Sequence, residues 1–256
     1  MSGKYQDKKR KKHSKKKSPL LWIIIGLIAL VICVLVAVVF RNVIKFPAAA
    51  PATNAVETTV LQTETNPLLP MDLGQGLEIT GISNYSGVYM EDGSDEIVTG
   101  VLMITVKNNN ELPLQYAEIT VTGDTGDAEF SVSTLAPGAS AVLLEKNRIQ
   151  YDYKAEYTAA EAEYVAFFQE QLSLCEDKLK IQTLDGAMNI SNITEQDITE
   201  DITIYYKNSA NDVFYGGITY RIRLEGGIKA GEIRQIMANH FYDPGSNIVM
   251  VTCGIG

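Results

Sequence analysis

The amino-acid sequence predicts a mainly β protein that is held at a membrane by one N-terminal helix. Three observations lead to this prediction: an uncharged run of 21 residues at 20–40, apolar and polar residues that alternate in later segments, and turn-forming pairs between those segments. An apolar run of that length spans a bilayer as a helix, whereas a period of two is typical of strands with one solvated face. We therefore expect a transmembrane helix, a stalk and two antiparallel β-sandwich modules joined by an α-helix.

Residues 1–19 form a strongly basic segment directly before the apolar run. This segment has nine Lys or Arg residues and one acidic residue, Asp7, whereas only Arg41 and Lys45 follow the run closely. The asymmetry predicts a cytoplasmic tail, with the chain after Arg41 outside the cell membrane. The residues expected to set this orientation are Lys15, Lys16, Lys17 and Trp22.

Two other interpretations of this N-terminal region are less favoured. A lysine-rich block can bind nucleic acid, but a tail beside a bilayer meets lipid headgroups first, and residues 47–256 carry a net charge of −19. The apolar run also exceeds the usual ~7–15 residues of a signal-peptide core, and the bulky Ile32 before Cys33 does not suit a lipoprotein site. The sequence therefore predicts an uncleaved anchor and no nucleic-acid partner.

Residues 41–71 are rich in Pro, Ala and Thr and lack a sustained apolar period, which predicts a stalk. The chain beyond the stalk is long enough for two cores, which we place at 72–150 and 178–256. Four short segments recur in the same order at offsets of 100 to 107. The pairs are LEITGI with LKIQTL, LMITVKN with DITIYYKN, YAEITVTG with GGITYRIRLEGG, and LAPGAS with YDPGSN. This order predicts a duplicated module.

Each module is predicted to consist of strands. In ITYRIRLE the apolar residues Ile218, Tyr220, Ile222 and Leu224 alternate with polar ones, and Ala117, Ile119 and Val121 alternate in the same way. Gly-Gly, Asn-Asn, Gly-Asp and Pro-Gly pairs separate these runs, as turns do between the strands of a sandwich.

The paired turn motifs resemble those of small bacterial extracellular sandwiches of the FxLYD and CARDB type. Lys-Asn at 107–108 and 207–208 precedes a turn, and Pro-Gly at 137–138 and 244–245 precedes an apolar strand. The resemblance covers 77–147 and 179–253, although the second module has Asp-Pro-Gly in place of the LxPG turn. It implies a role as a spacer, a ligand holder or an assembly domain.

Residues 151–177 are predicted to form the helix that connects the modules. Alanine and glutamate are abundant there, and Tyr157, Ala160, Tyr164 and Phe167 recur at spacings of three and four. We expect the aromatic face of this helix to pack against one of the sandwiches, and a self-association face is the alternative.

The exported region lacks the residues of the common catalytic centres. Since His13 lies in the tail, only His240 is available to a Ser-His-Asp or Cys-His apparatus, and a histidine-based zinc site would lack ligands. No GxSxG, P-loop or HExxH motif occurs. We therefore predict a protein that is not an enzyme and has no cofactor, with His240 at a surface or strand edge.

Acidic loops and two cysteines are the remaining candidates for a site. Weak Ca²⁺ candidates are Asp92, Asp95 and Glu96 in the acidic run EDGSDE, and Asp124 and Asp127 in the run GDTGDAE. Neither run has the ligand spacing of a known calcium loop, so solvated hairpin loops are expected. Outside the cell, Cys175 and Cys253 could form a disulfide or remain free thiols.

The features together predict a membrane-anchored, extracytoplasmic binding or assembly protein of the cell envelope. Its expected partners are the lipid bilayer and an envelope protein, with a homo-oligomer as an open alternative. Two other functions compete with this one. A carboxylate-based hydrolase of wall polymers would need a cleft with two close carboxylates, one of them with a raised pKa. An accessory sensor or regulator subunit would act through the basic tail.

Overall fold

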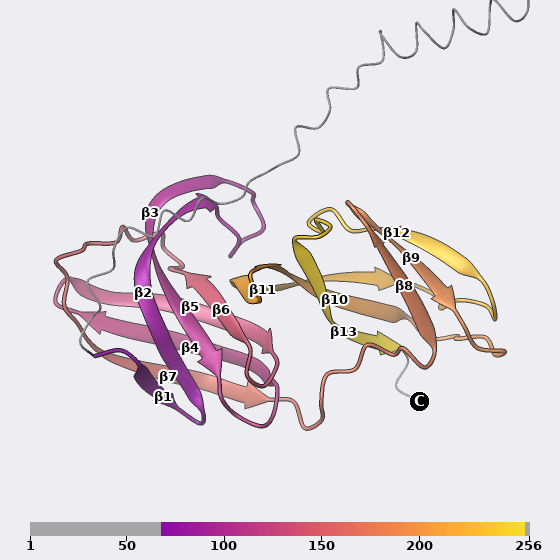
Figure 1. Cartoon of the computed structure of the whole chain (residues 1–256), viewed down its shortest axis with the longest axis horizontal. Coiled ribbons are helices and arrows are strands. Elements are labelled where there is room, and N and C mark those ends of the chain that lie inside the picture. Colours follow the sequence, from indigo (N-terminus) through magenta and orange to yellow (C-terminus); the bar gives the residue numbers. More distant parts are fainter. Residues whose placement is uncertain (1–67, 254–256) are drawn as a thin grey trace, which may run out of the picture. The chain divides into compact units, whose positions relative to one another are not determined.

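The computed structural model describes residues 68–253, and the basic tail, the predicted membrane span and the stalk up to residue 67 lie outside this range. Within it the chain forms thirteen β-strands and no helix, so the expectation of a mainly β protein is confirmed for this region. None of the described segments is a helix long and apolar enough to cross a membrane. The strands lie in three sheets (Figure 1).

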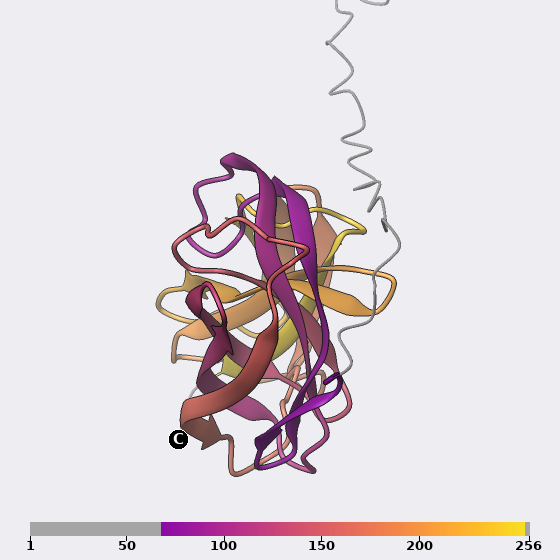
Figure 2. The same cartoon turned by 90° about the vertical axis from the view of Figure 1, so that its left-hand side faces the viewer.

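The N-terminal half of the described region consists of two antiparallel layers. The β3 layer contains, in spatial order, β1 (Met71–Gly74), β2 (Leu77–Val88), β3 (Ile97–Asn108) and β6 (Ser140–Leu144). The β4 layer contains β5 (Gly126–Leu135), β4 (Leu114–Gly123) and β7 (Tyr157–Phe167). Figure 2 shows β2 and β3 side by side as a long, twisted hairpin.

Alternate residues of the two layers face each other and form one hydrophobic core. Ile79 and Ile104 from the β3 layer and Ile119 and Phe130 from the β4 layer are at most 1% exposed. Burying such side chains fully stabilises the fold by about 1.5–3 kcal/mol each. The alternation predicted for Ala117, Ile119 and Val121 is confirmed, because all three are buried on one face of β4.

The C-terminal half is built in the same way. The β10 layer contains β11 (Val213–Leu224), β10 (Ile202–Ala210) and β13 (Ser246–Cys253). The β9 layer contains β12 (Ile233–Met237), β9 (Ala187–Asn192) and β8 (Leu179–Leu184). A second core lies between them and includes Met188, Ile190, Ile204 and Phe241, each at most 1% exposed.

The two halves have the same topology. The order β2-β3-β6 facing β5-β4-β7 corresponds to β8-β9-β12 facing β11-β10-β13. Buried asparagines mark equivalent positions at the ends of β3 and β9. The Asn108 side-chain amide donates to the carbonyls of Leu112 and Leu135, and that of Asn192 donates to the carbonyls of Gln196 and Ile228.

This correspondence corrects the pairing of repeats expected from the sequence. LMITVKN lies in β3 and DITIYYKN in β10, but β3 corresponds to β9 and β10 to β4. Of the four matched pairs, LEITGI with LKIQTL alone joins equivalent strands, β2 and β8. The turn before β6 contains Pro137-Gly138, whereas the equivalent turn before β12 contains Ala230-Gly231, and Pro244-Gly245 precedes β13. Short alternations of polar and apolar residues look alike in any strand, so three of the four sequence matches join strands that are not equivalent in the two halves.

The predicted connector helix at 151–177 is wrong. Its central part, Tyr157–Phe167, is strand β7, which pairs antiparallel with β4, so the N-terminal half extends beyond residue 150. Ala160 and Ala162 pack against the core, as do Val165 and Phe167, but Tyr164 between these pairs has φ +50° and the pairing register shifts there. The irregularity places Ala162 and Val165 three residues apart, a spacing that a helix would also give. Tyr164, which the helical pattern included, is 73% exposed.

The two halves are joined within one sheet. The edge strands β6 and β11 pair in parallel, with Val213 opposite Ser140 and Tyr215 opposite Val142, so the β3 and β10 layers form a sheet of seven strands. A third, smaller core lies at this join. It consists of Tyr85, Tyr89, Val142 and Leu144, with Val98, Met103, Val213 and Tyr215 packed against it.

Candidate binding site at the junction of the two halves

The loop between β2 and β3 folds over the join. Its first residue, Tyr89, is 2% exposed, and its hydroxyl donates to the carbonyls of Glu145 and Lys146, both at 3.0 Å. The Tyr89 N–H donates to the carbonyl of Glu96 at the other end of the loop, at 2.7 Å. These bonds hold the acidic run EDGSDE against the segment that follows β6.

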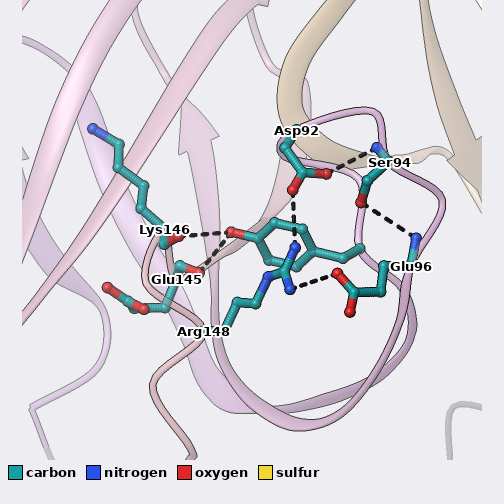
Figure 3. A network of polar contacts seen from close by, with 7 residues as sticks. Asp92, Ser94, Glu96, Glu145, Lys146 and Arg148 are labelled. Atoms are coloured by element: carbon teal, nitrogen blue, oxygen red, sulfur yellow. Dashed lines mark hydrogen bonds and ion pairs between the residues drawn. The ribbon is translucent and has the colours of Figure 1, made fainter.

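Arg148, which follows β6, gathers the outer carboxylates of this loop (Figure 3). Its guanidinium donates to Glu96 Oε2 at 2.6 Å and to Asp92 Oδ2 at 2.9 Å, and it lies 4.4 Å from the centre of the Tyr89 ring. Hydrogen bonds from Ser94, together with Arg148, lower the pKa of Asp92. The loop is therefore an ordered polar cluster, in which two carboxylates and the face of an aromatic ring hold one guanidinium group.

Glu91 occupies the fork where β6 and β11 separate. The hydrogen-bonded ladder between these strands ends at the pair Tyr215 and Val142. Two residues further along each strand, Leu144 and Gly217 are no longer paired with each other. The Glu91 carboxylate accepts from both, at 2.8 Å from Leu144 N and at 2.8 and 3.0 Å from Gly217 N. A side chain thus replaces the missing backbone partner and ties the two halves together.

Burial raises the pKa of Glu91 to about 6, even though the hydrogen bonds from Leu144 and Gly217 and the charge of Lys207 act in the opposite direction. Desolvation disfavours the charged carboxylate, whereas donated N–H groups and a nearby cation favour it. The balance leaves this carboxyl able to change its charge near neutral pH.

Lys207, from β10, is fully buried on the other side of the same fork. Its Nζ donates to the carbonyls of Ser133, Gly217 and Ile218 at 3.1, 3.1 and 2.7 Å and to Thr219 Oγ1 at 3.3 Å. All four neighbours accept, so they match an ammonium with three hydrogens better than a neutral amine with two. Burial lowers the pKa of Lys207 to about 7, and the charge of Glu91 opposes this shift.

Gly217 allows the strands at the fork to approach closely. A Cβ at this position would lie 1.7 Å from the carbonyl oxygen of Ser131 in β5 and 3.2 Å from Glu91 Oε2. No side chain fits there, so β11 can cross β5 at this point only with glycine. This packing need accounts for the second glycine of the GGITY segment.

A cavity of about 500 Å³ opens beside the cluster. Its lining residues are Tyr89, Glu91, Asp92, Ser131, Lys146, Asn147 and Arg148. Two acids and two bases therefore share the cavity, but Arg148 is engaged by Asp92 and Glu96, and Lys146 lies 3.8 Å from Glu118. The volume suits a small polar ligand or one residue of a larger one.

The five Ca²⁺ candidates do not form one cluster, although Asp92 and Glu96 share Arg148 as a partner. Asp95 lies 3.4 Å from His240 Nδ1. Asp124, in the β4–β5 turn, accepts from the N–H of Glu156, which precedes β7, and Asp127 in β5 is exposed. Among residues 68–253, no group of three or more His, Cys, Asp or Glu side chains is arranged to hold a metal ion.

His240 and the two cysteines lie in the C-terminal half. The His240 ring stacks on Tyr220, with centroids 4.9 Å apart, in the loop before β13. Cys175 and Cys253 are free thiols, and Cys175 donates to the Val251 carbonyl at 3.3 Å. Burial, and then the neighbouring Cys175, raises the pKa of Cys253 to about 12. The membrane-orienting residues Lys15, Lys16, Lys17 and Trp22 lie outside the described residues.

Sequence reasoning missed the two charges that matter most at the junction. Glu91 belongs to an acidic run that is typical of a solvated loop, and Lys207 stood out only as part of a Lys-Asn pair. The available signal was Lys207 itself, because it lies in an otherwise apolar strand, ITIYY, where a charge needs a partner. The chain matches no protein-family model and no curated protein sequence, so the resemblance to the FxLYD and CARDB sandwiches rests on the turn motifs alone.

Proposed function

We propose that this chain is a non-catalytic binding or assembly protein of the cell envelope, anchored by residues 20–40, with two β-sandwich modules outside the cell. One observation carries the proposal. Lys207, which is fully buried, and Glu91, which is partly buried, bind the backbones of opposite halves to each other. Since burying charges costs free energy, this arrangement is best understood as a means of holding two modules in one fixed relation.

A fixed pair of modules suits a protein that positions partners relative to each other. The cavity beside the junction supports a binding role, since its Arg148 and Tyr89 are held in place before any ligand arrives. Binding groups that are ordered in advance lose less entropy when a ligand binds.

A hydrolase of wall polymers is the second candidate, because one observation favours it. Glu91, with its pKa raised to about 6, and Asp92, with its pKa lowered, are adjacent and both line the cavity. Environments that push the pKa values of two carboxyls apart are characteristic of acid–base pairs. Against this, both oxygens of each carboxylate already accept hydrogen bonds from the protein, from Leu144, Gly217, Ser94 and Arg148.

The binding proposal is tested by capture of the full chain from cross-linked membranes, followed by mass spectrometry. The matched control is a chain that ends at residue 71, which keeps the tail, the apolar run and the stalk. We expect defined envelope proteins with the full chain that are at least about tenfold depleted with the control. Equal recovery from both chains would overturn the proposal.

The same purified full chain separates the two candidates when it is incubated with wall polymers. The binding proposal expects no release of soluble sugar. Release that is lost in Glu91→Gln and Asp92→Asn, but kept in Asp127→Asn, would establish the hydrolase instead, since Asp127 is an exposed carboxylate of β5 outside the cavity.

A further inference from the structure

Most free edges of the sheets are blocked. The segment between β7 and β8 covers the edge of β13, since the Ser173 carbonyl accepts from the Val251 N–H at 2.7 Å. The edge of β5 is covered by Lys146, whose N–H donates to the Glu129 carbonyl at 2.9 Å. At the other end of the seven-stranded sheet, β1 has only four residues. The outer positions of β7 include exposed Glu161 and Glu163. Short strands, covering segments and charges are the usual means of preventing edge-to-edge association.

No described segment hydrogen-bonds to the outer edge of β12, a strand of five residues, and this strand contains no acidic residue. Among the described residues β12 pairs with β9 alone, and Asn192 N bonds to Glu232 O and Ala238 N to Gly186 O. In an antiparallel ladder the positions between these bonded pairs point the other way, so the N–H and C=O groups of Ile233, Gln235 and Met237 face outward. Their side chains share the solvent face, where Ile233 and Met237 are each 66% exposed.

The sequence of β12 is complementary to itself about Gln235. Two copies of a strand related by a two-fold axis pair antiparallel. With the axis at Gln235, the amide faces its own copy, and Ile233 faces Met237 of the partner subunit on the same surface. All three outward residues then form bonded pairs, which gives about six backbone hydrogen bonds. Apolar groups meet apolar groups and an amide meets an amide, so no position is mismatched.

Charge favours the same edge for contact between copies. Residues 47–256 carry a net charge of −19, so most faces of two copies repel each other. The strand Ile233–Met237 contains no acidic residue, and its one base, Arg234, is turned inward to donate to the carbonyls of Gly227 at 2.8 Å and Glu225 at 3.3 Å. Two copies can therefore approach here without opposing charges of the same sign.

We propose that two copies of this chain associate through their β12 strands, which pair antiparallel about Gln235 and join the two β9 layers into one six-stranded sheet. This inference does not depend on the proposed function, because a binding protein and a hydrolase could both be dimeric.

Disulfide trapping tests the geometry. In the full chain, Gln235→Cys would place two thiols across the axis, where Cα atoms of a bonded pair lie about 5.5 Å apart, within the range of a disulfide. The matched control is Gln182→Cys, since Gln182 of β8 is an exposed amide in the same row of the sheet, beyond Asn189. The copies of this residue would be more than about 20 Å apart.

After mild oxidation of cell membranes that contain the full chain, we expect a covalent dimer for Gln235→Cys. The parent chain, which reports on the native cysteines, and Gln182→Cys should stay at background. A Gln235→Cys chain that stays monomeric, or a Gln182→Cys chain that cross-links equally well, would overturn the proposal. A covalent product with a different protein would also overturn it and would show that another strand occupies this edge.

A second pair of variants keeps the proposal falsifiable if cysteine disturbs the edge. Gln235→Lys would place two like charges directly opposite each other, whereas Gln182→Lys adds the same charge away from the axis. By sedimentation at about 10 µM, we expect the parent and Gln182→Lys to be dimers and Gln235→Lys to dissociate at least about tenfold more readily. A monomeric parent, or an unchanged Gln235→Lys dimer, contradicts the inference.

Discussion

Glu91 and Lys207 are charged residues used for joining strands. Each lies at the fork of β6 and β11, and each bonds mainly to backbone groups, Glu91 to N–H donors and Lys207 to carbonyl acceptors. The Gly217 N–H and C=O groups are thereby hydrogen-bonded, although the β6–β11 ladder ends before Gly217 and supplies no partner for them. Loss of Glu91 would leave the Leu144 and Gly217 N–H groups without this acceptor, and loss of Lys207 would leave the Gly217 and Ile218 carbonyls without this donor.

The raised pKa of Glu91 predicts how stability depends on pH. The folded value is about 6, whereas the ordinary value is 4.5, so the native state binds this proton more tightly than the unfolded state. The stabilising contribution is therefore complete below pH 4.5 and is lost as the pH rises through 6. Between pH 4.5 and 6.5, we expect the parent to lose about 1.5 kcal/mol of unfolding free energy relative to Glu91→Gln.

Urea unfolding followed by circular dichroism measures this difference. The contributions of the other carboxyls cancel between the two chains, and Lys207, whose lowered pKa is about 7, titrates mainly above this window. Parallel stability curves for the parent and Glu91→Gln would show that the carboxyl titrates as it does in the unfolded chain.

At the scale of single elements, sequence patterns predict regular strands well and irregular ones poorly. The even alternation of Ala117, Ile119 and Val121 identifies β4, because every second residue faces one core. The pattern of β7 is broken at Tyr164, where the register shifts, and alanine and glutamate then favour the wrong prediction. Intrinsic preference is a weak guide where the tertiary structure requires a strand beside β4.

The junction could not be predicted for a related reason. The contacts of Glu91 join residues 53 and 126 positions apart, and nothing local in an acidic loop indicates such partners. A buried lysine in an apolar strand signals only that some partner exists. The two glycines before ITYRIRLE were a clue to close packing, but they cannot say which strand approaches.

The crossing of β5 and β11 predicts the effect of adding one methyl group. Gly217→Ala would place a Cβ 1.7 Å from the Ser131 carbonyl, so the strands must move apart and strain the bonds to Glu91. We expect a loss of about 3 kcal/mol of unfolding free energy in urea. The matched control is Gly81→Ala in β2, where a Cβ would meet only ordinary contacts at 3.5 and 3.7 Å, and we expect a change within about 0.5 kcal/mol. Equal effects of the two substitutions would mean that β5 and β11 leave room for a methyl group at this crossing.

At the scale of the whole described region, two halves of equal topology share one sheet and one small core. The seven-stranded sheet runs from β1 to β13, and the third core draws side chains from β2, β3, β6 and β11. Modules connected only by a linker would share no core and would be expected to move independently. Here, separation of the halves would expose Tyr85, Leu144 and Tyr215 and break the ladder between β6 and β11.

This shared core predicts one cooperative unfolding transition for both halves. Measured by hydrogen exchange in the full chain, amides of β4 and of β10 should become unprotected with the same free energy, because opening one half removes the surface that the other half packs against. Tyr215→Ala removes an aromatic ring from the third core and leaves the two larger cores intact, so the protection of the two strands should diverge by about 2 kcal/mol or more. Tyr153→Ala serves as the control, since this ring is 77% exposed, and it should leave the two values equal. Unequal protection of β4 and β10 already in the parent chain would mean that the join at β6 and β11 is too weak to couple the halves.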